Sequence, residues 1–127
     1  MGKYNYNRSD FTPPAPAVPV RVSSPGAPWG LTLNALIDSG ADNTVLPSQV
    51  VEELRLPVVG TTWVAGAFDT TSRESKVFAA ELTMEFTPSQ IIRVIPFEKS
   101  YALLGRDILN RHKTLLDGPQ LILEVIV

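Results

Sequence analysis

The amino-acid sequence predicts an all-β fold with two short helices. Several stretches alternate apolar and polar residues with a period of two, as half-buried strands do, and the clearest runs from Ser75 to Phe86. Two short segments carry helix-start signals instead. The sequence shows no internal repeat and no regular alternation of strands with helices, which excludes Rossmann-type and α/β-barrel enzymes.

Length and composition are those of one ordinary globular domain. The chain has 127 residues, of which 44% are hydrophobic and 19% are charged. A formal net charge of -2 argues against a nucleic-acid partner, which would need a basic face. The lack of cysteine excludes disulfides, zinc–thiolate sites and cysteine nucleophiles. With no leader peptide and no apolar run of membrane-spanning length, we expect a cytoplasmic protein that binds neither membranes nor nucleic acid.

The first seventeen residues differ in composition from the rest of the chain. They are polar and then proline-rich, and such a segment cannot bury enough apolar surface to order itself. We therefore expect a flexible proline-rich arm at residues 1–17 and one folded domain at residues 18–127.

Strands are predicted in the domain where apolar residues alternate, or run continuously, between turn signals. The expected ranges are 18–22, 29–37, 58–67, 75–86, 90–97, 101–104, 114–116 and 121–127. The first helix is expected from Ser48, as its N-cap, to Leu54, with Pro57 ending it. The second is expected from Arg106 to His112, which would place this histidine on the surface near the helix C-terminus.

The most informative stretch is the run from Ala35 to Pro47. An apolar segment ends on Asp38, which is followed at once by Ser39 and Gly40, and a second apolar run begins after Asp42. A buried strand that delivers an acid into a tight turn would hold the carboxylate on rigid backbone. Gly40 allows a close approach or a positive φ, and the Ser39 hydroxyl supplies a donor to fix the turn. Asp38 is therefore the candidate catalytic acid.

Two other interpretations of this stretch are possible. Asp-Ser-Gly is a common surface turn. Asp38, Asp42 and Asn43 could also supply oxygen ligands to calcium, but their spacing lacks the alternating acids and distal glutamate of a calcium loop. The apolar residues on both sides favour catalysis, because a solvated turn would not be flanked by core segments. We expect no metal and no cofactor.

Two motifs resemble those of the retropepsins, the retroviral-type aspartic proteases, and their cellular single-lobe relatives. The first is Leu36–Leu46 (LIDSGADNTVL), and the second is Ala102–Leu109 (ALLGRDIL). Their order and separation match the family, and the resemblance covers residues 18–127. It implies a single-lobe acid-protease fold: a closed β-barrel with a flap hairpin and two short helices, active as a homodimer. The helix before the flap is more similar to that of the cellular or bacterial single-lobe relatives.

The resemblance also implies roles for individual residues. Asp38, Ser39 and Gly40 would form the catalytic turn, with Ser39 hydrogen-bonded across the dimer. Arg106 would pair with Asp42 in a buried structural ion pair, whose loss would cost on the order of 3–5 kcal/mol. The implied substrate-binding residues, from the catalytic loop, the flap and the second motif, are Ala41, Asp42, Val45, Val64, Ala65, Gly66, Ala67, Tyr101 and Leu103. They predict hydrophobic side chains on both sides of the cleaved bond.

A count of motifs predicts the oligomeric state. Hydrolysis of a peptide by water needs a base for the water and an acid for the carbonyl oxygen or the leaving amine. The chain contains one Asp-Ser-Gly, since Asp69-Thr70-Thr71 lacks the glycine. The second carboxylate must then come from another copy in a two-fold dimer. The N-terminal strand and the strand at 121–127 are the expected interface elements, and the partners are a second copy and a peptide or protein substrate.

Two further functions remain open at this point. A retropepsin-fold module could bind peptides or dimerise without cutting, although an intact Asp38-Ser39-Gly40 has no use in a pure binder. A small structural β-barrel could use Asp-Ser-Gly as a turn only, which would leave the second motif unexplained.

Overall fold

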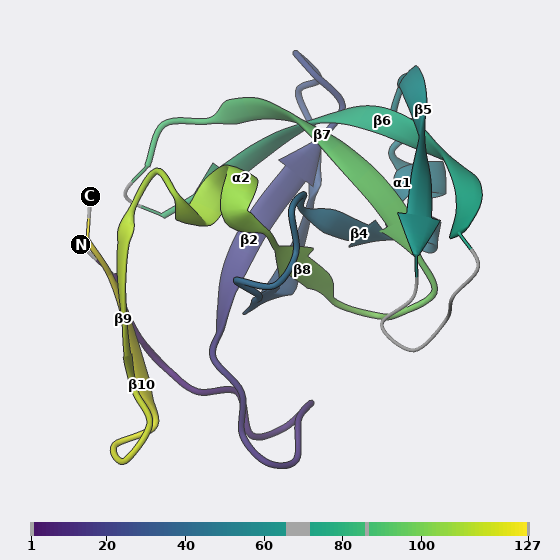
Figure 1. Cartoon of the computed structure of the whole chain (residues 1–127). Coiled ribbons are helices and arrows are strands. Elements are labelled where there is room, and N and C mark those ends of the chain that lie inside the picture. The colour runs from purple at the N-terminus through teal and green to yellow at the C-terminus, as the bar shows by residue number, and fades with distance from the viewer. Residues whose placement is uncertain (1, 66–71, 86, 127) are drawn as a thin grey trace.

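In the computed structural model, which describes residues 2–65, 72–85 and 87–126, most strands belong to one curved sheet (Figure 1). The strand order is β2-β3-β8-β4-β7-β6-β5, and β2 also pairs with β6, so the sheet closes into a barrel. Its strands are β2 (Ala17–Ser23), β3 (Leu31–Ile37), β4 (Val45–Pro47), β5 (Val58–Ala65), β6 (Ser72–Met84), β7 (Gln90–Phe97) and β8 (Ala102–Leu104). The all-β prediction is confirmed.

The alternation seen in the sequence becomes the inside and outside of this barrel. In β2, Val18, Val20 and Val22 are buried, whereas Pro19 between them is exposed. In β6, Leu82 and Met84 likewise point into the core. One continuous cluster of buried side chains joins the strands and both helices.

β5 and β6 form an antiparallel hairpin at one end of the barrel. Their pairing runs from Val58 with Phe78 to Ala65 with Ser72. The tip predicted for the flap, including Gly66 and Ala67, lies outside the described residues. The hairpin itself is present where the sequence predicts it, with Val64 half-buried near its end.

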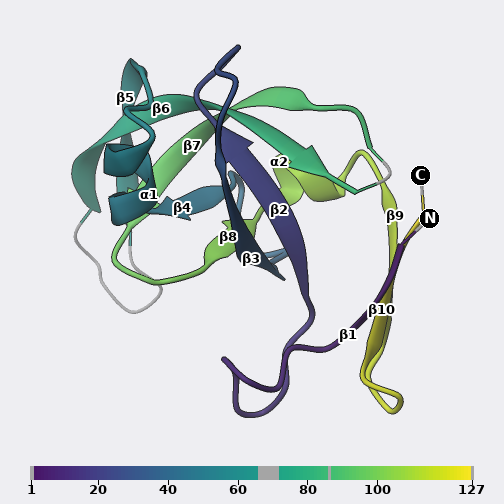
Figure 2. The same cartoon turned by 180° about the vertical axis from the view of Figure 1, so that it is seen from behind.

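A second, three-stranded sheet stands beside the barrel, as Figures 1 and 2 both show. It consists of β1 (Gly2–Asn5), β10 (Ile122–Ile126) and β9 (Lys113–Asp117), in the order β1-β10-β9 with antiparallel pairing throughout. Gly2 pairs with Val125, so the two ends of the chain lie side by side.

The N-terminal segment differs from the expected flexible arm. Residues 2–5 form β1, Asn7 and Ala15 form a β-bridge, and the rings of Tyr4 and Tyr6 pack against the core. Burial raises the pKa of Tyr4, and the neighbouring Glu85 carboxylate raises it further. The expectation considered only the segment's own composition. The edge of β10 supplies hydrogen-bond partners for the backbone of β1, and the composition of residues 1–17 alone cannot predict a partner at the other end of the chain.

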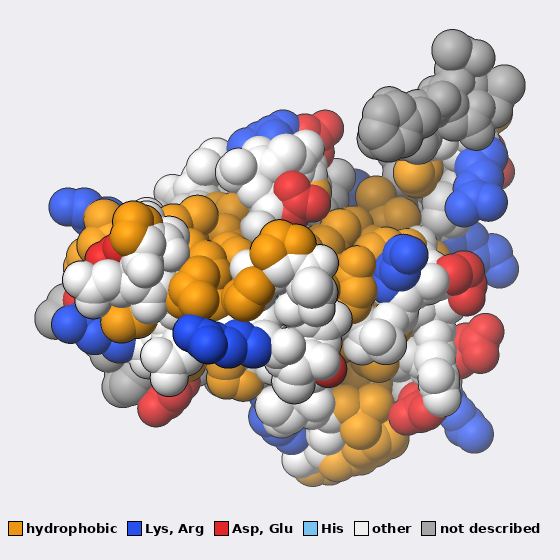
Figure 3. Space-filling view, turned by 90° about the horizontal axis from the view of Figure 1, so that it is seen from below, with side chains coloured by type: hydrophobic (Ala, Val, Ile, Leu, Met, Phe, Trp, Pro, Cys, Tyr) orange, Lys and Arg blue, Asp and Glu red, His pale blue; other side chains and the backbone are white. Residues whose placement is uncertain are grey.

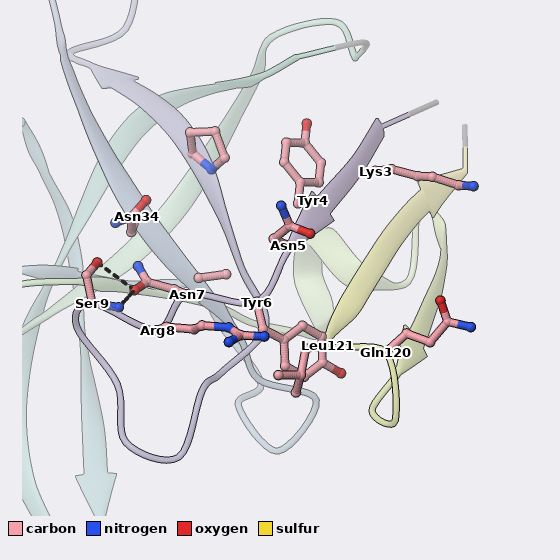
Figure 4. A pocket seen from close by; sticks show the side chains of 12 residues that line it. Lys3, Tyr4, Asn5, Tyr6, Asn7, Arg8, Ser9, Asn34, Gln120 and Leu121 are labelled. Carbon is pink, nitrogen blue, oxygen red and sulfur yellow. Dashed lines mark hydrogen bonds between the residues drawn. The ribbon is translucent and has the colours of Figure 1, made fainter.

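This segment also lines a wide groove of about 820 Å³ between β1, β2 and the turn before β10 (Figure 4). Its wall is mostly polar, and Asn7 accepts hydrogen bonds there from both the amide and the hydroxyl of Ser9. Of the predicted catalytic and substrate-binding residues that the structure describes, none lines this groove.

Both predicted helices exist, with corrections at their ends. α1 (Ser48–Glu53) has Pro47 rather than Ser48 at its N-cap, and the Ser48 hydroxyl donates instead to the Phe97 carbonyl and to Glu98. α2 (Arg106–Leu109) ends before His112. Both ring nitrogens of His112 are buried and find no hydrogen-bond partner among the described residues, so its expected surface position is wrong. Neither described helix is long and apolar enough to cross a membrane.

Candidate active site

Asp38 follows directly on the last residue of β3. The strand runs parallel to β8, with Ile37 opposite Leu104, and the Asp38 amide donates to the Leu104 carbonyl at 3.0 Å. The strand pairing therefore continues into the first residue of the turn. The half-buried carboxylate is mounted on two strands of the barrel rather than on a free loop.

The turn itself is closed by its own backbone. The Gly40 amide donates to Oδ1 of Asp38 at 3.0 Å, and the Ala41 amide donates to the Asp38 carbonyl at 3.2 Å. A Cβ at position 40 would lie 3.2 Å from Oδ1 of Asp38, so a side chain there would crowd the carboxylate. Ser39 and Gly40 are exposed at the surface. The structure thus brings the three predicted catalytic residues together in one turn.

The second motif packs directly on the first. The Arg106 amide donates to the Ala41 carbonyl at 2.9 Å. A Cβ at Gly105 would lie 2.6 Å from the backbone carbonyl of Asn43 and 3.0 Å from the Ala41 oxygen, so only glycine fits there. The two motifs, although far apart in the sequence, therefore pack against each other as two sides of one site.

Below this contact lies a polar network that the sequence reading missed. Oγ1 of Thr44, which is fully buried, donates to Oδ1 of Asp107 at 2.8 Å, and the Thr44 amide donates to Oδ2 at 3.0 Å. The Gly105 amide in turn donates to Oγ1 of Thr44 at 3.2 Å. A polar threonine directly before an apolar run, together with the acid after Gly-Arg, was the available signal.

Replacing Thr44 with valine is expected to lower the free energy of unfolding by about 1–3 kcal/mol, because the buried Gly105 amide loses its acceptor and Asp107 loses a donor. Chemical denaturation measures this change. Thr32→Val, the same substitution at an exposed position of β3, is the matched control and is expected to change little. Equal effects at the two positions would contradict a supporting role for the network.

Arg106 and Asp42 pair as the family resemblance implies, but not in a buried site. Their side chains are 43% and 80% exposed, respectively. The predicted cost of 3–5 kcal/mol is therefore wrong, since an ion pair this exposed contributes at most about 1 kcal/mol. Arg106 also donates to the Ser39 carbonyl at 2.7 Å. Its structural role is thus to hold the backbone of the catalytic turn.

Among the other predicted substrate-binding residues, Ala41 belongs to this turn, and Val45 and Leu103 lie on β4 and β8. Ala41, Val45 and Leu103 are half-buried, and Val45 pairs with Leu103 across β4 and β8. The ring of Tyr101 packs edge-on against Phe11, with ring centres 4.9 Å apart. Phe11 belongs to the N-terminal segment, which the sequence reading left without a role. That these residues contact substrate stays a prediction.

An apolar hollow opens beside Ser39. Its volume is about 300 Å³, and it is lined by Ile37, Ser39, Leu109, His112, Thr114 and Leu116. In the described part of the chain, no three histidine or acidic side chains gather closely enough to hold a metal ion. The candidate acid–base group of the site is the Asp38 carboxylate, which the Gly40 amide holds in the turn.

Comparisons with known proteins agree with this geometry. A family model described as aspartyl protease matches residues 18–108, which include the first motif and all but the last residue of the second. The solution structure of the simian foamy virus (mac) protease is 17% identical with a TM-score of 0.57, and the match covers 75% of this chain and 92% of that one.

The EIAV protease, solved with an inhibitor, is 22% identical with a TM-score of 0.56, covering 85% of this chain and 93% of that one. No curated protein matches the chain. The matched family spans the catalytic turn and the Gly105-Arg106 contact that supports it. The chain is therefore a member of the aspartyl protease family with the single-lobe, all-β retropepsin fold.

Proposed function

We propose that the chain is an endopeptidase that works as a homodimer, with Asp38 of each copy meeting at a two-fold axis. One observation carries this proposal. Each chain mounts one Asp-Ser-Gly turn on rigid strands, and the family's chemistry needs two carboxylates. A second copy supplies the missing half of the site with the same geometry.

In such a dimer the two carboxylates would share one proton, which is the known behaviour of aspartic-protease dyads. The ionised carboxylate takes a proton from a water held between the two, while the water oxygen attacks the peptide carbonyl. The protonated carboxylate gives its proton to the carbonyl oxygen. The carboxyl that took the water proton then gives it to the nitrogen, while the other carboxylate takes a proton from a hydroxyl of the tetrahedral intermediate. The C–N bond breaks, and an acid and an amine are released.

The surface next to the catalytic turn supports a second copy as the occupant. The hollow beside Ser39 is walled mainly by apolar side chains, and His112 is one of its lining residues. Leu115 and Leu116 on β9 are each 51% exposed. Figure 3 shows further hydrophobic side chains spread over one face of the molecule. Burying such surface favours association.

The expected interface elements need revision, because their edges are already paired. β10 lies in the middle of the small sheet, and β2 pairs on both sides, with β3 and β6. The free edges of the small sheet belong to β1 and β9. A sheet that continued from one copy to the next would therefore use β1 or β9.

The substrate that fits this arrangement is an extended peptide with apolar residues on both sides of the cleaved bond. Val45 and Leu103 offer half-buried aliphatic surface near the turn, and we expect the β5–β6 hairpin to cover a bound peptide.

Activity measured against protein concentration tests the proposal. Specific activity on a peptide library is expected to rise with enzyme concentration and to level off where sedimentation shows the dimer. Constant specific activity down to concentrations at which only monomer sediments would overturn the homodimeric mechanism.

A further inference from the structure

A second, smaller hollow lies between the catalytic loop and the hairpin. It measures about 150 Å³ and is lined by Asn43, Thr61, Thr62, Val77, Arg93 and Ile95. We refer to it as the Asn43–Arg93 hollow. It contains none of the residues that the sequence reading assigned to substrate binding.

The fold explains why these residues meet. Asn43 follows the catalytic turn, and two residues later Val45 pairs with Ile95 of β7. The Ile95 amide also donates to the Thr44 carbonyl at 3.3 Å. β7 then pairs with β6, and β6 with β5, which carries Thr61 and Thr62. The hollow therefore spans from the catalytic loop to the hairpin expected to cover a bound peptide.

Its chemistry is that of an anion site rather than an apolar pocket. Buried Val77 and half-buried Ile95 supply the apolar surface, whereas the other four residues bring hydrogen-bond donors. Arg93 is exposed, and no carboxylate lies within ion-pair distance of it in the described parts of the chain. The acid nearest along the loop, Asp42, already pairs with Arg106.

We propose that the Asn43–Arg93 hollow is a subsite for an acidic side chain of the substrate. This side chain belongs to a substrate residue that is not adjacent to the cleaved bond. The inference rests on the proposed endopeptidase function and adds a substrate preference to it. A guanidinium binds a carboxylate through two parallel hydrogen bonds, and the hydroxyl and amide donors nearby complete the site. The preferred substrates are thus peptides with apolar residues at the cut and a glutamate or aspartate farther along.

Matched peptides test this assignment. Each pair carries glutamate or glutamine at a single position, and the positions are scanned along a cleaved sequence. For wild type, kcat/KM is expected to be roughly tenfold higher for the glutamate peptide only at the positions that reach the hollow, as a partly solvated charged hydrogen bond would give. Because a two-fold dimer carries two copies of the hollow, there should be at most one such position on each side of the cut. The preference should weaken as salt is added.

Three variants make the comparison specific. Arg93→Gln is expected to bring the glutamate-to-glutamine ratio close to one, and Arg93→Glu to reverse it and favour lysine. Arg8→Gln removes the same charge from the N-terminal groove and should keep the wild-type ratio. Binding of uncleavable glutamate and glutamine peptides to Asp38→Asn should show the same ratios.

The possible failures point to different conclusions. Asp38-dependent cleavage with equal rates for both peptides at every position, or a preference that survives Arg93→Gln, would overturn the subsite and leave the protease function standing. Cleavage that persists in Asp38→Asn would overturn the proposed mechanism instead.

Discussion

Replacing Asp38 with asparagine is expected to abolish peptide hydrolysis and leave the fold intact. The amide keeps the size of the carboxylate and can still accept the hydrogen bond from the Gly40 amide. It cannot take a proton from water, so both halves of a symmetric site lose their acid–base function. Because positioned acid–base groups contribute about 10²–10⁴-fold to rate, we expect a loss of at least about 10³-fold.

The measurement is hydrolysis of a peptide library with purified wild type and variant, alongside circular dichroism and sedimentation. Glu52→Gln, the same acid-to-amide change on the exposed face of α1, is the matched control and should keep full activity. Peptide binding without cleavage by the wild type would favour the alternative of a binding module.

Gly105→Ala is expected to have the largest effect on stability. The added methyl group would lie 2.6 Å from the carbonyl carbon and oxygen of Asn43, and both atoms belong to backbone fixed by the barrel. Relieving the overlap requires the two motifs to move apart, at a cost of about 3 kcal/mol. Movement of the loop that carries Asp38 and Asp42 should also lower activity more than tenfold.

Urea unfolding of wild type and variant gives the stability difference, since a change in midpoint at constant slope reports stability alone. Gly118→Ala is the matched control, because a Cβ at Gly118 would have no neighbour within 4 Å. Similar midpoints for the two alanine variants would refute the close approach of the motifs.

The sequence was sufficient to predict the strands whose apolar side chains recur at every second residue and are buried on one face. β2, β3 and β6 each alternate, so the position of these strands follows from the sequence, and in β2 so does the face that is buried. Asp38 could be identified because its turn interrupts two apolar runs. The partner of that turn, Gly105, could be located only through the family resemblance.

The errors have a common physical cause, which is that burial depends on what lies across space. Arg106 and Asp42 were paired correctly, yet their exposure follows from the surrounding surface and not from the motif. β1 was missed because its partner, β10, lies at the other end of the chain. His112 was expected on the surface at the end of a helix. The helix ends earlier, at Leu109, and the ring nitrogens of His112 are buried by the surrounding structure.

The polar sites illustrate a second limit. Thr44 and Asp107 are 63 residues apart, and no local pattern links a hydroxyl to an acid over that distance. The Asn43–Arg93 hollow likewise draws its donors from a loop and from β5 and β7, so it exists only once the sheet has formed.

Mixing active and inactive copies provides the most direct test of whether two chains share one active site. Wild type and Asp38→Asn are combined in varying ratio at fixed total concentration, allowed to exchange subunits, and assayed. If each site needs an intact Asp38 from both chains, activity should fall with the square of the wild-type fraction. A linear fall under conditions of demonstrated exchange would mean that each chain acts alone, and would contradict the shared site.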